Sequence, residues 1–162
     1  MKTSTISEIK KALHELDKFE VVELCLRLAK YKKENKELLN YLVFDASNEQ
    51  AFIEEVKQEI NDLYTELPRA NAYVTKKGLR KILKITHKYN KYANSKTVEL
   101  DLLLHVCHKM KSERYSPTVL SFVNVTLEKQ MLKMRKAMQG LHEDLQYDYN
   151  QELEKLFLNN LT

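Results

Sequence analysis

The feature of this sequence that most constrains its fold is the scarcity of turn-forming residues. Two glycines and two prolines occur in 162 residues, whereas average usage gives roughly eleven and eight. All-β and doubly wound folds need many tight turns, which glycine and proline supply through their special backbone angles. A chain with so few of them is typical of helices joined by short polar links.

Capping signals and apolar periodicity divide the chain into about eight helices. Thr5 with Glu8, and Asp17 with Glu20, have the capping-box spacing that starts the first two. Pro68 ends one helix, because the residue before a proline is pushed out of the helical region, and Ser116–Pro117 starts another. The expected helices cover approximately residues 5–16, 17–31, 36–44, 47–67, 71 or 75–92, 96–111, 117–140 and 142–161.

The sequence therefore predicts an all-α protein with about eight helices in antiparallel hairpins. Two arrangements are open: a short α-solenoid of the HEAT-like type and an irregular helical bundle. A weak internal repeat is the basis of the solenoid hypothesis: residues 29–33 resemble residues 87–91, and residues 37–39 resemble residues 102–104. No linker rich in glycine or proline interrupts the chain, which predicts a single helical domain over residues 1–162. The segment 36–44 is dense in large apolar side chains, and we expect it near the centre of the core.

The distribution of apolar residues and cysteines favours a cytoplasmic protein that does not enter a membrane. The longest apolar run is too short to span a bilayer, and the first residues lead into an amphipathic pattern rather than an apolar leader. Cys25 and Cys107 each lie among apolar residues at helical spacing. We expect buried, reduced thiols; a disulfide is the alternative.

Charge is segregated along the chain. Between Leu67 and Val98 there are nine bases and no acid, so this segment carries +9, whereas the remaining 18 bases and 23 acids sum to −5. On a helical wheel, six of the bases fall on one face, opposite Leu79 and Ile82. These six form the candidate binding face: Lys77, Arg80, Lys81, Lys84, Lys88 and Lys91.

Three interpretations of this basic face are open. It is a solvated face, or one paired with the acidic stripe of the preceding helix, which consists of Glu55, Glu59, Asp62 and Glu66. Alternatively, it docks an acidic protein partner. The third possibility is a nucleic acid. The lysine and arginine side chains would then contact its phosphates, and Tyr73, Tyr89 and Tyr92 would stack on its nucleobases.

No residue pattern in the sequence points to catalysis, and we expect no enzyme and no cofactor. Asp101, His105 and His108 stand at i, i+4 and i+7 and are the best metal candidate. They lie opposite the apolar stripe of their helix and lack an identified fourth ligand. Ordinary surface histidines are the alternative, and no metal is assigned.

Two stretches resemble known families. Residues 9–13 (Ile-Lys-Lys-Ala-Leu), with Val21-Val22-Glu23-Leu24 and Arg27-Leu28, resemble the SAP-type helix-extended-helix DNA-binding module. The link Asp17-Lys18-Phe19 lacks that module's glycine and its following base, so DNA binding is not implied. Residues 24–35, followed by Leu38-Leu39 and Tyr41-Leu42, resemble uncharacterised all-helical bacterial proteins of similar length. That likeness implies a bacterial cytoplasmic protein and no site residues.

These observations together predict a non-enzymatic helical scaffold that binds a protein partner. The alternative is a nucleic-acid-binding protein that uses the basic face of the helix at about 75–92. Neither the partner nor the oligomeric state follows from the sequence.

Overall fold

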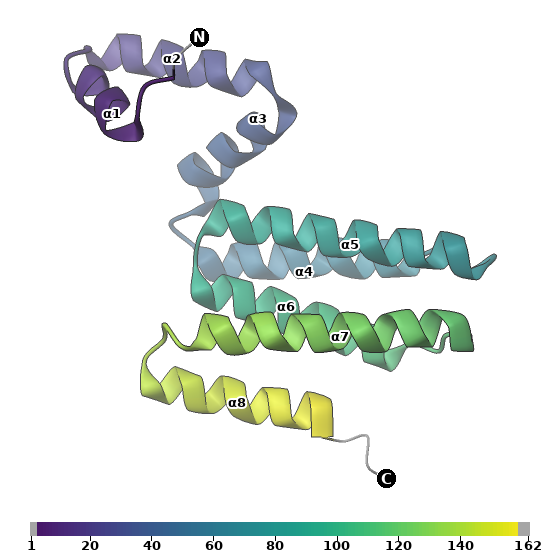
Figure 1. Cartoon of the computed structure of the whole chain (residues 1–162). Coiled ribbons are helices and arrows are strands. Elements are labelled where there is room, and N and C mark those ends of the chain that lie inside the picture. The colour runs from purple at the N-terminus through teal and green to yellow at the C-terminus, as the bar shows by residue number, and fades with distance from the viewer. Residues whose placement is uncertain (1–2, 159–162) are drawn as a thin grey trace. The chain divides into compact units, whose positions relative to one another are not determined.

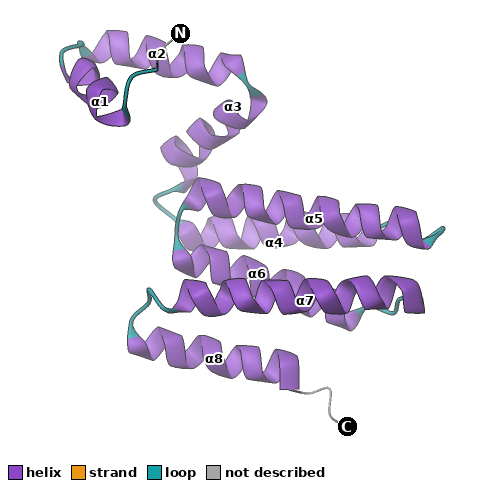
Figure 2. Ribbon diagram, in the orientation of Figure 1, coloured by secondary structure: helices purple, strands orange, loops and turns teal. Residues whose placement is uncertain are grey.

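The computed structural model describes residues 3–158 and is all-α, with no strand in those residues (Figure 2). This confirms the predicted fold class. The described residues form eight α-helices and one short π-helix: α1 (Ile6–His14), α2 (Lys18–Tyr31), α3 (Lys33–Asn40), η1 (Tyr41–Asp45), α4 (Glu49–Thr65), α5 (Ala72–Ala93), α6 (Lys96–Ser112), α7 (Pro117–Met138) and α8 (Glu143–Leu158). The prediction for residues 159–161 lies outside the described residues.

The chain forms two compact units, residues 1–45 and residues 46–162. Each unit is described by itself. The single domain expected from the sequence remains a prediction.

Unit 1 begins with the two capping boxes that the sequence predicts. The side chain of Thr5 accepts from the Glu8 amide, and the Glu8 carboxylate accepts from the Thr5 amide in return. Asp17 and Glu20 make the same reciprocal pair at the start of α2. These bonds satisfy amide groups that a helix start otherwise leaves without an acceptor.

The expectation that residues 36–44 lie at the centre of the core is wrong. The segment is divided between α3 and η1; Tyr41 is buried, but Leu42, Val43 and Phe44 are exposed. Neither α1 nor α2 contains a buried residue. The physical reason is size, because a segment of about 45 residues is too small to enclose an apolar interior by itself.

Unit 2 is a stack of antiparallel helices in two layers (Figure 1). Each helix packs on the next one along the chain, and alternate helices also pack: α4 on α6, α6 on α8, and α5 on α7. One layer therefore contains α4, α6 and α8, and the other contains α5 and α7. This zigzag of antiparallel hairpins forms an all-α bundle.

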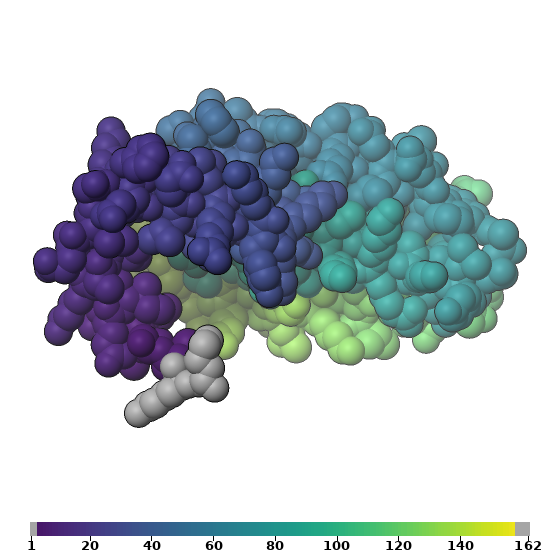
Figure 3. Space-filling view, turned by 90° about the horizontal axis from the view of Figure 1, so that it is seen from above, coloured from purple at the N-terminus to yellow at the C-terminus, as the bar shows by residue number. Residues whose placement is uncertain are grey.

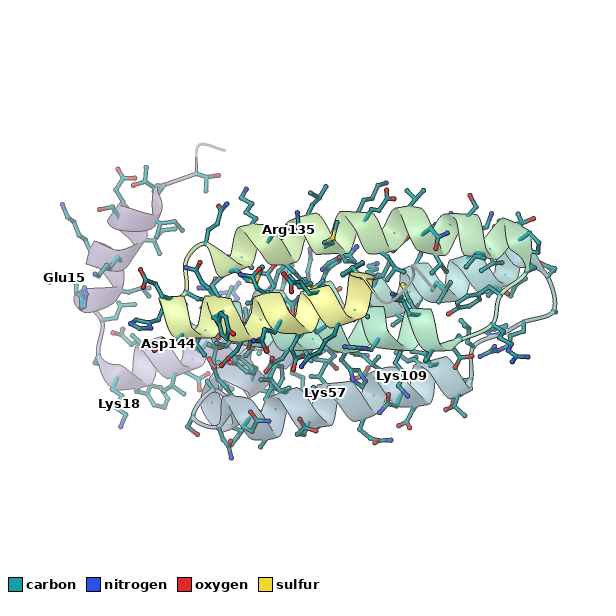
Figure 4. All side chains as sticks on the ribbon, turned by 90° about the horizontal axis from the view of Figure 1, so that it is seen from below. Glu15, Lys18, Lys57, Lys109, Arg135 and Asp144 are labelled. Atoms are coloured by element: carbon teal, nitrogen blue, oxygen red, sulfur yellow. The ribbon has the colours of Figure 1, made fainter. Side chains whose placement is uncertain are left out.

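The core of unit 2 is built around α6, which packs against α4, α5, α7 and α8. Its buried side chains point to nearly every side of the helix: Val98, Leu100, Leu102, Leu103, Leu104, Val106, Cys107 and Met110. Figure 4 shows α6 behind α8, between α4 and α7. A helix with apolar side chains around most of its circumference must be covered around most of it, and this requirement places α6 in the middle.

Local signals set the ends of the unit 2 helices. The Asn71 side chain accepts from the Val74 amide at the start of α5, and Pro117 occupies the first position of α7. α5 ends at Asn94, which is left-handed at φ 47°. Asparagine tolerates this conformation better than most residues, so it can end a helix without glycine. The observed ends lie within three residues of the predicted ones for α4 to α7.

None of the helices in the described part of the chain has the length and apolarity needed to cross a bilayer.

The central position of α6 generates a stability prediction. Leu103 is fully buried in α6, and replacing it with alanine leaves a cavity among four helices. We expect Leu103→Ala to lower the free energy of unfolding by about 2–5 kcal/mol, measured by urea denaturation. Leu132→Ala is the matched control, because Leu132 is 63% exposed on α7; its effect should stay within about 0.5 kcal/mol. Equal effects of the two changes would contradict this description of the core.

Candidate binding surface

The basic face of α5 points away from the core of unit 2. The opposite side of the helix is buried through Thr75, Leu79, Ile82 and Thr86. Lys77, Arg80, Lys81, Lys84 and Lys91 are exposed, and Lys88 is half-buried. The structure thus brings all six predicted residues onto one face. Figure 3 looks down on α5, with the blue surface of α4 on one side and the green surface of α7 on the other.

Most of this face makes no ion pair with the acidic stripe of α4. Among residues 3–158, no ion pair within 4.0 Å joins an acid of α4 to five of the six bases: Lys77, Arg80, Lys81, Lys84 and Lys91. Glu59 accepts instead from the Tyr89 hydroxyl at 2.5 Å, and Asp62 accepts from the Gln58 amide at 2.9 Å. The pairing that the sequence left open is therefore not formed by these five bases in the described residues.

The seam between α4 and α5 is closely packed. The ring of Tyr89 packs edge-on against Phe52 of α4, with 5.8 Å between the ring centroids. Nearer the start of α5, Gly78 lies so close to Leu67 of the α4–α5 link that an added Cβ would stand 2.5 Å from a leucine methyl carbon. An aromatic ring therefore fills the seam between α4 and α5, and a glycine lets the α4–α5 link pack closely on α5.

On its other side, α5 lies beside α7, and the two helices run in the same direction. The Arg80 guanidinium stacks on the Phe122 ring at 4.8 Å from its centroid. Farther along both helices, Lys133 Nζ lies 3.1 Å from His87 Nε2. Arg80 keeps its charge when it stacks on an aromatic face, so the contact fixes the side chain while leaving its charge in place.

His87 contributes no charge to the surface near neutral pH. Burial lowers its pKa below the ordinary histidine range, and the neighbouring Lys133 lowers the pKa further. A neutral Nε2 can accept from the Lys133 ammonium, which explains the short distance between them. The Lys133 ammonium extends the positively charged surface from α5 onto α7.

The outer surface of α7 adds apolar groups that the sequence analysis did not single out. Val125 and Leu132 are 48% and 63% exposed, and they lie opposite the buried positions Val123 and Met134 on the helix. Their i, i+7 spacing places them on one line along α7. That spacing was visible in the sequence, but only the packing of α7 beside α5 places the two side chains next to the basic face. The layer formed by α5 and α7 therefore presents cations next to exposed apolar side chains.

Only one of the three tyrosines considered for base stacking is available for it. Tyr73 is 72% exposed and, by helical spacing, shares the basic face with Lys77 and Lys84. Tyr89 packs against both Phe52 and Tyr92, and Tyr92 is buried. The ring faces of Tyr89 and Tyr92 are thus engaged within the fold.

The metal candidate on α6 does not assemble into a metal site in the described residues. Asp101 accepts from the Tyr149 hydroxyl of α8 at 2.8 Å, and His105 Nε2 lies 2.9 Å from Asn61 Oδ1 of α4. No group of three or more histidine, cysteine, aspartate or glutamate side chains within residues 3–158 could hold a metal ion. The expectation that this side of α6 faces solvent is wrong for Asp101 and His105, which are half-buried, because α4 and α8 cover it.

The two cysteines have different surroundings. Cys107 is buried in α6, and burial raises its pKa to about 12, which keeps the thiol protonated. Cys25, in unit 1, is half-buried. The expected burial holds for Cys107 but not for Cys25, because the small unit 1 covers Cys25 only in part.

Protein-family models, curated proteins and solved structures offer no match to this chain.

His105 generates a prediction about acid stability. Burial lowers its pKa, and Lys57 of α4 and Lys109 of α6, both labelled in Figure 4, act in the same direction. In the unfolded chain the His105 imidazole has the ordinary pKa of 6.5, so it takes up a proton more readily there than in the folded protein. The stability that neutral His105 contributes is complete above pH 6.5. It is lost as the pH falls below this value and through the lowered pKa that His105 has in the folded protein.

We expect His105→Gln to reduce the loss of unfolding free energy between about pH 7.5 and about pH 5.5, measured by urea denaturation. Some loss should persist, because His87 has a pKa shifted in the same direction. An identical loss in the variant and the wild type would show that His105 is not desolvated in the folded protein.

Proposed function

We propose that this chain is a non-catalytic interaction scaffold that binds an acidic segment of a partner protein on the outer face of α5 and α7. The observation that carries the proposal is the row of exposed bases on α5 beside the exposed Val125 and Leu132 of α7. A reduced, cytoplasmic, bacterial setting is part of the same proposal.

Each half of this surface supplies a different part of recognition. Exposed cations attract an acidic partner over a distance and orient it, but they contribute little net affinity individually. Apolar side chains that become buried on binding supply most of the affinity. The segment that fits best therefore has carboxylates along one side and aliphatic or aromatic side chains at helical spacing beside them.

Nucleic acid is the second candidate. The basic residues from 77 to 91 extend for about 21 Å at the rise of an α-helix, which is long enough to contact several consecutive phosphates, and Tyr73 is exposed on the same face. Protein is favoured because Val125 and Leu132 have no counterpart on a phosphate backbone. In addition, Tyr89 and Tyr92 are packed and cannot stack on bases without repacking.

The test compares three probes of similar net charge: an amphipathic Glu/Leu helical peptide, poly-glutamate and a short DNA duplex. We expect the full-length protein to bind the Glu/Leu peptide most tightly, measured by fluorescence anisotropy across a salt series. Lys81→Glu with Lys84→Glu should weaken this binding at least about tenfold, since reversing two charges affects both attraction and pairing. Tightest binding to DNA would instead support the second candidate.

Two control variants make the outcome specific. Lys10→Glu with Lys11→Glu changes the net charge equally at exposed positions of α1 and should leave peptide binding unchanged. Leu132→Ser should weaken binding of the Glu/Leu peptide while sparing that of poly-glutamate, because only the former has an apolar side. Circular dichroism confirms folding of each variant. Peptide binding that responds equally to both charge reversals would contradict a docking site on α5.

A further inference from the structure

A cavity of about 290 Å³ lies within unit 2, between the α4–α5 link and the α6–α7 link. Its walls include Arg69 and Arg114, one from each link, together with the first residues of α5 and Ser116 at the start of α7. No carboxylate is among the described residues that line it. The cavity is therefore positively charged, and it is distinct from the basic face on the side of α5.

The two arginines differ in their partners. Arg69 Nη2 lies 2.7 Å from Glu113 Oε2, and this pair ties the two links together. A guanidinium has five N–H donors, so a contact with one carboxylate oxygen leaves donors for a ligand. Arg114 is exposed, and no acid within residues 3–158 lies within 4.0 Å of it. Its charge is therefore available to an anion in the cavity.

The helix starts around the cavity also lack negative charge. In the described chain, α5 and α7 are the α-helices without an acid in the first turn. The other six have one or two: Glu8, Glu20, Glu34, Glu49, Glu99, and Glu143 with Asp144. An acid there balances the positive end of the helix dipole. The two helices that lack this compensation both begin at the same cavity.

The starts of α6 and α7 differ in the charged side chains that lie near them. Neither Ser95 of α6 nor Ser116 of α7 makes a side-chain cap bond. At α6 the Glu49 carboxylate accepts from the hydroxyls of Ser95 and Thr97, at 3.1 and 3.4 Å. At α7 the described residues supply no such carboxylate, and the neighbouring charged side chain in the cavity wall is Arg114. An external anion can occupy the position that Glu49 fills at α6.

We propose that this cavity binds the phosphate group of a small phosphate monoester. A phosphate oxygen pair matches the fork of an arginine, and a dianion suits a site with two guanidinium groups and two helix starts. The cavity has room for about ten water-sized volumes, enough for a phosphate and a few attached atoms. A free metabolite and a phosphorylated side chain of a peptide present the same group. The proposal uses other residues than the proposed function and does not rest on it.

The test is a titration of the full-length protein with inorganic phosphate at constant ionic strength, followed by amide NMR shifts. We expect saturable shifts at Ala72 and Ser116, and at least about tenfold weaker binding in Arg114→Gln, because one charge-assisted hydrogen bond is lost. Arg114 is chosen because it makes no ion pair in the described structure that folding could depend on. Lys81→Glu with Lys84→Glu should retain these shifts, which separates this site from the basic face.

Phosphoserine and a short phosphoserine peptide then distinguish the two sources of the ligand. Tighter binding of phosphoserine indicates a free small molecule, whereas tighter binding of the peptide indicates a modified protein. Absence of saturable shifts at Ala72 and Ser116, or equal phosphate affinity in Arg114→Gln, would overturn the proposal.

Discussion

The structure of unit 2 depends on the burial of α6. This helix has apolar side chains on nearly all sides, so it gains the most from being enclosed. Each fully buried leucine contributes about 1.5–3 kcal/mol relative to an exposed one, and Leu100, Leu102 and Leu103 are all fully buried. Four helices with one apolar face each are what such a helix requires. Their packing around α6 produces the two layers, with α4 and α8 beside it and α5 and α7 across from it.

Enclosing α6 determines which surfaces face solvent. The apolar side of α5 packs against the core, so its lysine and arginine side chains lie on the solvent side of the helix. Its two flanks are then occupied differently: Tyr89 packs against α4, Gly78 packs against the α4–α5 link, and Arg80 and His87 contact α7. Because consecutive helices are antiparallel, α5 and α7 begin at the same end of the unit, which brings Arg69 and Arg114 to one cavity.

Unit 1 is a contrast to this arrangement. Nine of the 14 residues of α2 are apolar, and none of the 14 is buried. Phe19, Leu28 and Tyr31 are among its most exposed side chains. Sequence analysis expected a core near residues 36–44 because it counted large apolar groups there. Apolar residues become core only where other elements cover them, and a unit of this size has too few elements to do so.

The sequence by itself determined the helices, their caps and the basic stripe of α5. These features depend on residues three or four positions apart, such as the pair Thr5 and Glu8, the proline at 117 and the spacing of Lys77, Arg80, Lys81 and Lys84. Only the tertiary structure decided which helices are neighbours. It placed Val125 and Leu132 beside the basic face, kept His87 neutral next to Lys133, and engaged Asp101 and His105 in contacts with α8 and α4. Those outcomes depend on contacts between residues about 45 positions apart, and the local periodicity of a helix carries no information about such contacts.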